Sequence, residues 1–174
     1  MKDDICQKWF VLFGVCGFLV LSILSVRTQD SQLALKEMLV SLELTCPSCA
    51  QGLERRLLRL PEIKEIEVRH ADGEISVKSG DGESIDSKKV HDTVRNAGFI
   101  PDGFDVTGIG QVFTRDSVVG ITFGDNSFFE LAEGDQNVQL LQADALQSFL
   151  ITGRVDPETP DRIEVVSVKR FSLR

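Results

Sequence analysis

Apolar and polar residues alternate through the middle of the chain in a pattern that predicts strands and helices in turn. Met38–Leu44 (MLVSLEL) alternates in the way that is typical of a half-buried strand. Pro47 then suits the first turn of a helix, where a missing N–H costs nothing. Leu53, Leu57 and Leu60 follow at helical spacing, and a second proline ends the pattern. The segment therefore predicts a strand followed by an amphipathic helix.

Two further alternating segments follow, and a tight turn joins them. Ile63–Arg69 and Glu74–Ser79 both alternate with the period of a strand. Asp72 and Gly73 stand between them, and this dipeptide is a strong signal for a β-hairpin.

A second helix and a last strand complete the pattern. Ile85–Ala97 carries Val90 and Val94 on one helical face, and Gly98 suits the C-terminal cap. Phe99–Val106 predicts an irregular closing strand. The order is βαββαβ, which predicts a ferredoxin-like α+β sandwich over residues 37–106, with both helices on one face of an antiparallel sheet.

The remaining residues, 107–174, form a different pattern. Gly108–Phe113 (GIGQVF) is interpreted as a turn at a domain boundary, and further strands follow it. A short helical piece is predicted at Ala143–Phe149, before the fourth of five strands. Five strands in this arrangement favour a small, mostly-β, OB-like barrel. The alternative is an irregular sheet packed on the first domain.

The N-terminus predicts a membrane anchor. Trp9–Val26 contains no charged side chain and is long enough to cross the hydrocarbon layer as a helix. Residues 1–27 are therefore interpreted as a single transmembrane helix, with a cleaved signal peptide as the alternative. Lys2 and Lys8 precede the span, which favours an extracytoplasmic, periplasm-like location for the rest. Residues 28–36 would be a polar linker.

Composition and charge exclude several classes of function. Hydrophobic residues are 42% and charged residues 26% of the chain, as expected for a globular protein. The formal net charge of −8 disfavours nucleic acid as a partner. No Ser-His-Asp pattern, catalytic carboxylate pair or phosphate-binding glycine loop is evident, so we do not expect an enzyme.

The cysteines carry the candidate chemistry. Cys6 and Cys16 lie in or beside the apolar N-terminal segment, whereas Cys46 and Cys49 form a Cys-x-x-Cys pair. Such a pair serves either soft-metal binding or redox exchange. Cys46 lies at the predicted strand-to-helix turn and Cys49 in the first helical turn, where the helix dipole favours thiolates.

The segment from Lys36 to Val106 resembles the heavy-metal-associated domain family. This family includes copper chaperones, modules of metal-pumping ATPases and periplasmic mercury-binding proteins. The resemblance rests on LTCPSC (Leu44–Cys49), on NAGF (Asn96–Phe99) and on the βαββαβ order. Leu44 replaces the methionine of the family motif. The resemblance implies metal binding by Cys46 and Cys49.

The residue chemistry indicates which ions such a site would bind. Two thiolates on an adaptable loop can form a near-linear two-sulfur site. Such a site suits a soft ion, most of all Cu(I), and Hg(II) by the same softness. Zn(II) prefers four ligands, and this domain offers no further cysteine.

The predicted topology brings two more residues to the cysteine end of the sandwich. The hairpin with His70 and the loop with Phe99 would both lie beside Cys46 and Cys49. Phe99 would shield the ion from water. His70 is either a third ligand or a solvated turn residue.

Three functions follow from these patterns. The first is a membrane-tethered, non-enzymatic protein that binds a soft metal and passes it to or from a partner with exposed thiols. The second is a metal-free interaction module on the same fold. The third is a thiol–disulfide redox protein, although the thioredoxin-like pattern that usually carries such a pair is absent.

Overall fold

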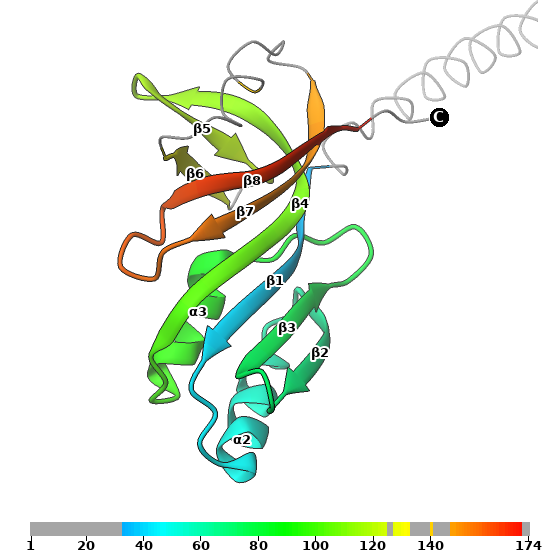
Figure 1. Cartoon of the computed structure of the whole chain (residues 1–174). Helices are drawn as coiled ribbons and strands as arrows, with labels where there is room; N and C mark the ends of the chain where they lie inside the picture. The colour runs from blue at the N-terminus through cyan, green and yellow to red at the C-terminus, as the bar shows by residue number, and fades with distance from the viewer. Residues whose placement is uncertain (1–32, 125–126, 133–139, 141–146, 172–174) are drawn as a thin grey trace, which may run out of the picture.

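A computed structural model describes residues 33–124, 127–132, 140 and 147–171 of the chain (Figure 1). The predicted anchor over residues 1–27 lies outside these described residues. Within them, no helix is long and apolar enough to cross a membrane.

The first unit is an antiparallel sheet of four strands with two helices. Its strands lie in the order β2-β3-β1-β4, and each neighbouring pair is antiparallel. This is the ferredoxin-like arrangement that the sequence predicts. The elements are β1 (Ala34–Leu42), α2 (Pro47–Leu57), β2 (Ile63–Arg69), β3 (Glu74–Ser79), α3 (Ser87–Asn96) and β4 (Pro101–Arg115).

Alternation along the strands builds the core of this unit. Val40, Val77 and Val106 are fully buried, whereas their neighbours in sequence are mostly less buried. The helices meet this face through their predicted apolar stripes, including Leu57 of α2 and Val94 of α3, both 0% exposed. Full burial of an aliphatic side chain of this size contributes roughly 1.5–3 kcal/mol. The helices are therefore held to the sheet mainly by apolar packing.

The first strand begins earlier than the sequence pattern predicts. β1 starts at Ala34, so the last part of the predicted linker over residues 28–36 belongs to the sheet. Leu35 is fully buried, its N–H donates to Ser84 Oγ at 2.9 Å, and its carbonyl accepts from Ile85 N–H. The linker interpretation is wrong for residues 34–36, because they lie in β1, which pairs with β4, and form hydrogen bonds with residues distant in sequence.

The interpretation of Gly108–Phe113 as a boundary turn is also wrong. These residues lie inside β4, which runs unbroken through the predicted boundary between residues 106 and 107. Gly108 allows β1 to approach β4 closely and does not form a turn. A Cβ at this position would lie 2.5 Å from the carbonyl oxygen of Ala34. One long strand therefore belongs to both parts of the molecule.

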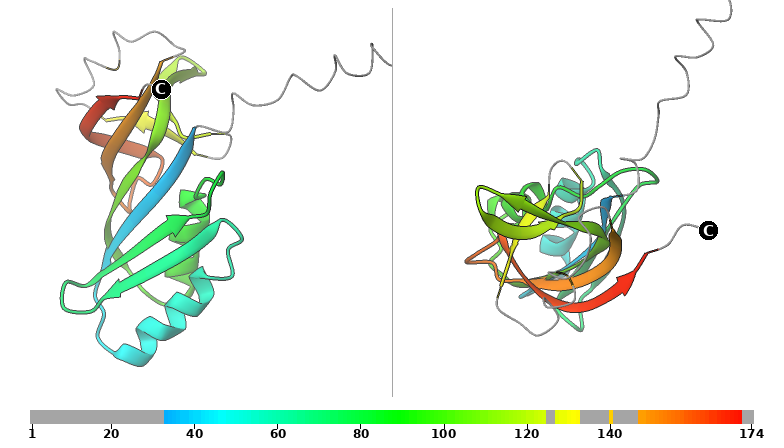
Figure 2. Two further views of the ribbon diagram at one scale, coloured as in Figure 1. Left: turned by 90° about the vertical axis from the view of Figure 1, so that its right-hand side faces the viewer. Right: turned by 90° about the horizontal axis from the view of Figure 1, so that it is seen from above.

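The C-terminal part is rich in β-strand, as predicted. Its strands pair in a ring, β4-β5-β6-β8-β7-β4, in which β6 and β8 are parallel and the other pairs antiparallel. Figure 2 shows this ring above the ferredoxin-like unit, with β4 passing through both. The added elements are β5 (Val118–Thr122), β6 (Phe128–Leu131), β7 (Ser148–Val155) and β8 (Arg162–Arg170).

Large apolar side chains fill the interior of the ring. Phe123 and Phe129 pack edge to face with their ring centres 5.9 Å apart, and Ile151 is fully buried. These residues join the helix-side residues in one hydrophobic cluster. The predicted helical piece Ala143–Phe149 overlaps β7, which begins at Ser148, and its residues 143–146 lie outside the described residues.

Candidate metal centre

The cysteine loop connects the end of β1 to the start of α2. Cys46 has an extended backbone (φ −146°, ψ 139°) and caps the helix, and Pro47 occupies its first turn. The Cys46 sulfur accepts a hydrogen bond from the Cys49 N–H at 3.1 Å and lies 3.4 Å from Ser48 Oγ. The sequence pattern predicted this placement of both cysteines. The cap satisfies one of the N–H groups that a helix leaves open at its start.

Cys46 and Cys49 are joined by a disulfide, with their Cα atoms 5.3 Å apart. The structure therefore represents the oxidised form of the pair. A thiolate is the metal ligand in cysteine sites. Two electrons must consequently enter the pair before both sulfurs become available to an ion.

Apolar packing on one side of the loop leaves its other side open. Leu44 packs against the core, so the leucine in place of the family's methionine keeps the apolar contact. Ala50 and Leu53 are each 1% exposed and hold the first turns of α2 to the sheet. Cys46, which lies between Leu44 and Ala50 in the sequence, is half-buried, and Cys49 is exposed. The loop is thus held by apolar packing on one side, while solvent can reach the cysteine pair from the other.

A groove of about 700 Å³ runs beside Cys49, and we call it the metal-side groove. Phe99 lines it together with Cys49, as the predicted topology requires. Phe99 is half-buried and packs against the core, and its N–H donates to Val94 O at 3.2 Å. Gly98 takes φ +90° at the end of α3, which is the predicted C-terminal cap. Phe99 follows this cap directly and forms part of the groove wall.

The hairpin with His70 also lies at this end of the sheet. Leu42 N–H donates to Gly73 O at 2.8 Å, which ties the hairpin to the start of the cysteine loop. His70 itself is exposed and is not among the residues that line the metal-side groove. Among the described residues, no three His, Cys, Asp or Glu side chains gather closely enough to hold an ion. A ligand role for His70 stays a prediction.

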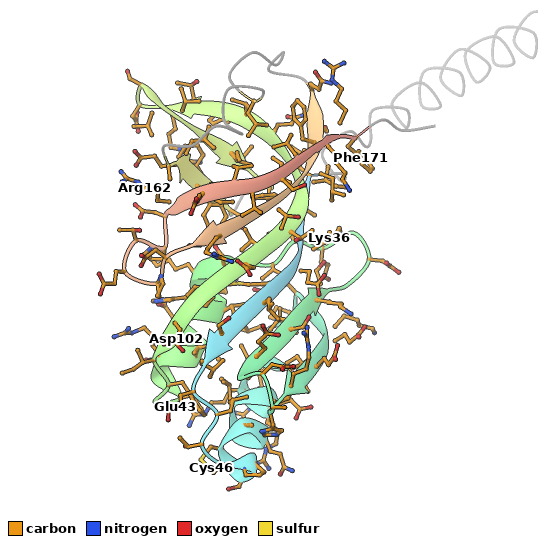
Figure 3. The ribbon with its side chains drawn as sticks, viewed as in Figure 1. Lys36, Glu43, Cys46, Asp102, Arg162 and Phe171 are labelled. Atoms are coloured by element: carbon orange, nitrogen blue, oxygen red, sulfur yellow. A yellow bond between two sulfur atoms is a disulfide. The ribbon has the colours of Figure 1, made fainter. Side chains whose placement is uncertain are left out.

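The structure adds charged residues that sequence reasoning did not assign to the site. Glu43, Asp102 and Arg56 line the metal-side groove, and Figure 3 shows Glu43, Cys46 and Asp102 at the same end of the molecule. Arg56 lies two helical turns from Cys49 on the same face of α2, and this spacing was the available signal. Asp102 comes from β4, so only the fold brings it here.

Comparisons with known proteins support this picture for part of the chain. The model of the heavy-metal-associated domain matches residues 40–99, from β1 to the loop after α3. The matched segment contains Cys46, Cys49 and Phe99. It supports a heavy-metal-binding, chaperone-type unit with the ferredoxin-like fold. No curated protein matches the chain.

Proposed function

We propose that this protein binds a soft metal ion through the reduced Cys46 and Cys49 and exchanges it with a partner. The observation that carries the proposal is the position of the pair, at the start of α2 beside an open groove. The match of residues 40–99 to the heavy-metal-associated domain supports the same function.

The donor set fits a soft ion of low coordination number. After reduction, the loop would offer two thiolates at the positive end of the α2 dipole. Two sulfur ligands suit Cu(I), our first choice, and Hg(II) by the same softness. The half-buried ring of Phe99 would limit the access of water from the groove side.

The exposure of Cys49 suits transfer rather than storage. A partner that presents thiols would replace the protein sulfurs one at a time, and an open site admits such a ligand exchange. The net charge of −8 favours a partner with a basic face. We propose that the protein is not an enzyme and that residues 1–27 tether it to a membrane, with the soluble part on the extracytoplasmic side.

The proposed function is tested by Cu(I) titration of the full chain in detergent, with reductant and a competing chelator. We expect one equivalent of tight binding for the wild type. The Cys46→Ser/Cys49→Ser variant should lose it, whereas His70→Ala should keep it if the thiolates alone hold the ion. Equal affinity of the wild type and the double cysteine variant would sink the proposal.

The disulfide favours one alternative, a metal-free interaction module on the same fold. Intact mass of the protein from its own membrane fraction, trapped without reductant, would reveal a permanently oxidised pair. A redox role would require insulin reduction well above the activity of a free dithiol.

We also propose that the strand ring belongs to the small OB-like barrels. The support is the closure of β4 on both β5 and β7 and the parallel pair β6 and β8.

A further inference from the structure

The two sulfurs of the disulfide lie in different surroundings. Cys49 is exposed and lines the metal-side groove, whereas Cys46 is half-buried and does not line it. A nucleophile arriving through the groove therefore meets the sulfur of Cys49 first. Access is one of the factors that decide which sulfur of a disulfide is attacked.

Hydrogen bonding also favours attack on Cys49, with Cys46 as the sulfur that leaves. The Cys46 sulfur already accepts the Cys49 N–H at 3.1 Å, and the Ser48 hydroxyl lies 3.4 Å away as a second donor. The Cys46 side chain also caps the N-terminus of α2, which is the positive end of the helix dipole. Among the described residues, no hydrogen bond reaches the Cys49 sulfur. Negative charge released by cleavage is therefore better stabilised on Cys46 than on Cys49.

The groove has room for an incoming molecule next to Cys49. Its volume of about 700 Å³ falls within the range of roughly 300–1,000 Å³ that holds small ligands. Gly52, one turn along α2 from Cys49, lines the groove, and a Cβ there would meet nothing within 4 Å. Ile100 borders the same groove and is 75% exposed.

We propose that a small thiol enters the metal-side groove and reduces the pair by attacking the sulfur of Cys49. A new disulfide forms between the incoming sulfur and Cys49, the bond between Cys46 and Cys49 breaks, and the electron pair leaves on Cys46 as a thiolate. A second thiol then displaces the first from Cys49. The products are the protein dithiolate, the disulfide of the reductant and the two protons that the thiols release to solvent. The step deepens the proposed function, because this dithiolate is the metal-binding form.

Sulfite identifies the attacked sulfur, since it cleaves a disulfide into a stable S-sulfonate on one cysteine and a thiolate on the other. We would treat the oxidised full chain, carrying Cys6→Ser and Cys16→Ser, with sulfite, quench with acid and map the product by mass spectrometry. We expect the Cys49 S-sulfonate to exceed the Cys46 product by roughly tenfold or more. In guanidinium chloride the preference should disappear. A predominant Cys46 product in the folded protein would overturn the proposal.

The route through the groove is tested with glutathione, which is larger than sulfite. Gly52→Phe should fill the groove and slow reduction by glutathione several-fold while leaving the rate with sulfite unchanged. Gly52→Ala is the matched control and should react like the wild type with both reagents. If Gly52→Phe slows both reagents equally, or neither, the groove is not the entry route.

Cu(I) titration of the same variants after full reduction separates this inference from the proposed function. Wild-type affinity combined with attack on Cys46 would refute the inference and leave metal binding standing. Selective attack on Cys49 without tight Cu(I) binding would refute the proposed function instead.

Discussion

At the scale of single residues, Cys46 has a structural role besides its sulfur chemistry. Its backbone is extended, and its side chain accepts the N–H of Cys49 at 3.1 Å, so it acts as the N-cap of α2. Serine is among the preferred residues at this position and alanine is not. The same side chain thus starts the helix and supplies a candidate ligand.

This double role predicts different stabilities for two variants that both remove the ligand. In reducing buffer, Cys46→Ser should keep the cap, whereas Cys46→Ala should lose about 1 kcal/mol of unfolding free energy relative to Cys46→Ser. Urea denaturation of the two full-length variants measures the difference. Equal stabilities would mean that the cap does not contribute.

The sequence predicts where the candidate ligands lie better than it predicts what surrounds them. The spacing of Cys46 and Cys49 at a strand-to-helix turn was visible in the chain, and so was the glycine before Phe99. The unequal exposure of the two cysteines was not visible. It depends on how Leu44, Ala50 and Leu53 pack beneath the loop.

At the scale of elements, two glycines that line the metal-side groove have opposite conformational requirements. Gly52 lies within α2, where a Cβ added to the backbone would point into open space. Gly98 ends α3 with φ +90°, a conformation that disfavours any side chain. The same substitution should therefore act in opposite directions at the two positions.

Gly52→Ala should raise the unfolding free energy by about 0.5–1 kcal/mol, because alanine loses less backbone entropy in a helix. Gly98→Ala should lower it by about 1 kcal/mol or more because of the left-handed backbone. Chemical denaturation of both variants under oxidising conditions checks the signs. A loss of stability at Gly52 would contradict the open space beside α2.

The elements of the ferredoxin-like unit were predictable because period and turn chemistry are local. Alternation, the leucine stripe of α2 and the hairpin glycine at position 73 each act within a few residues. β4 was misjudged for the opposite reason. Gly108 and Gly110 resemble turn residues, but they let β1, β5 and the ring of Phe123 approach the strand.

At the scale of the whole molecule, β4 makes one structural body of the two predicted domains. Its first half pairs with β1 on one edge and with β7 on the other, and its second half pairs with β5. Ala34 pairs with Ile109 and Leu35 with Gly108, so the first unit uses residues beyond position 106. The hydrophobic cluster is likewise continuous through both parts.

A chain cut at the predicted boundary should therefore fold poorly. Ending the protein after Val106 removes the partners of Ala34 and Leu35 and exposes the edge of β4 that β7 covers. We expect the truncated protein to lose cooperative urea unfolding, while the full chain shows one transition in circular dichroism and fluorescence. A truncated protein with the full-length midpoint would show that the two parts are independent.

The sequence by itself determined the order of the elements in the first unit, the Cys-x-x-Cys pair at the start of a helix and the β-rich character of the C-terminal part. Hydrophobic period, caps and turns act over short stretches of chain, so the residues carry this information directly. The shared strand, the groove beside Cys49 and the unequal exposure of the two sulfurs were decided by the tertiary structure. Each depends on residues far apart in sequence that the fold brings together, such as Leu35, which is hydrogen-bonded to Ser84, or Cys49 and Asp102, which line the same groove.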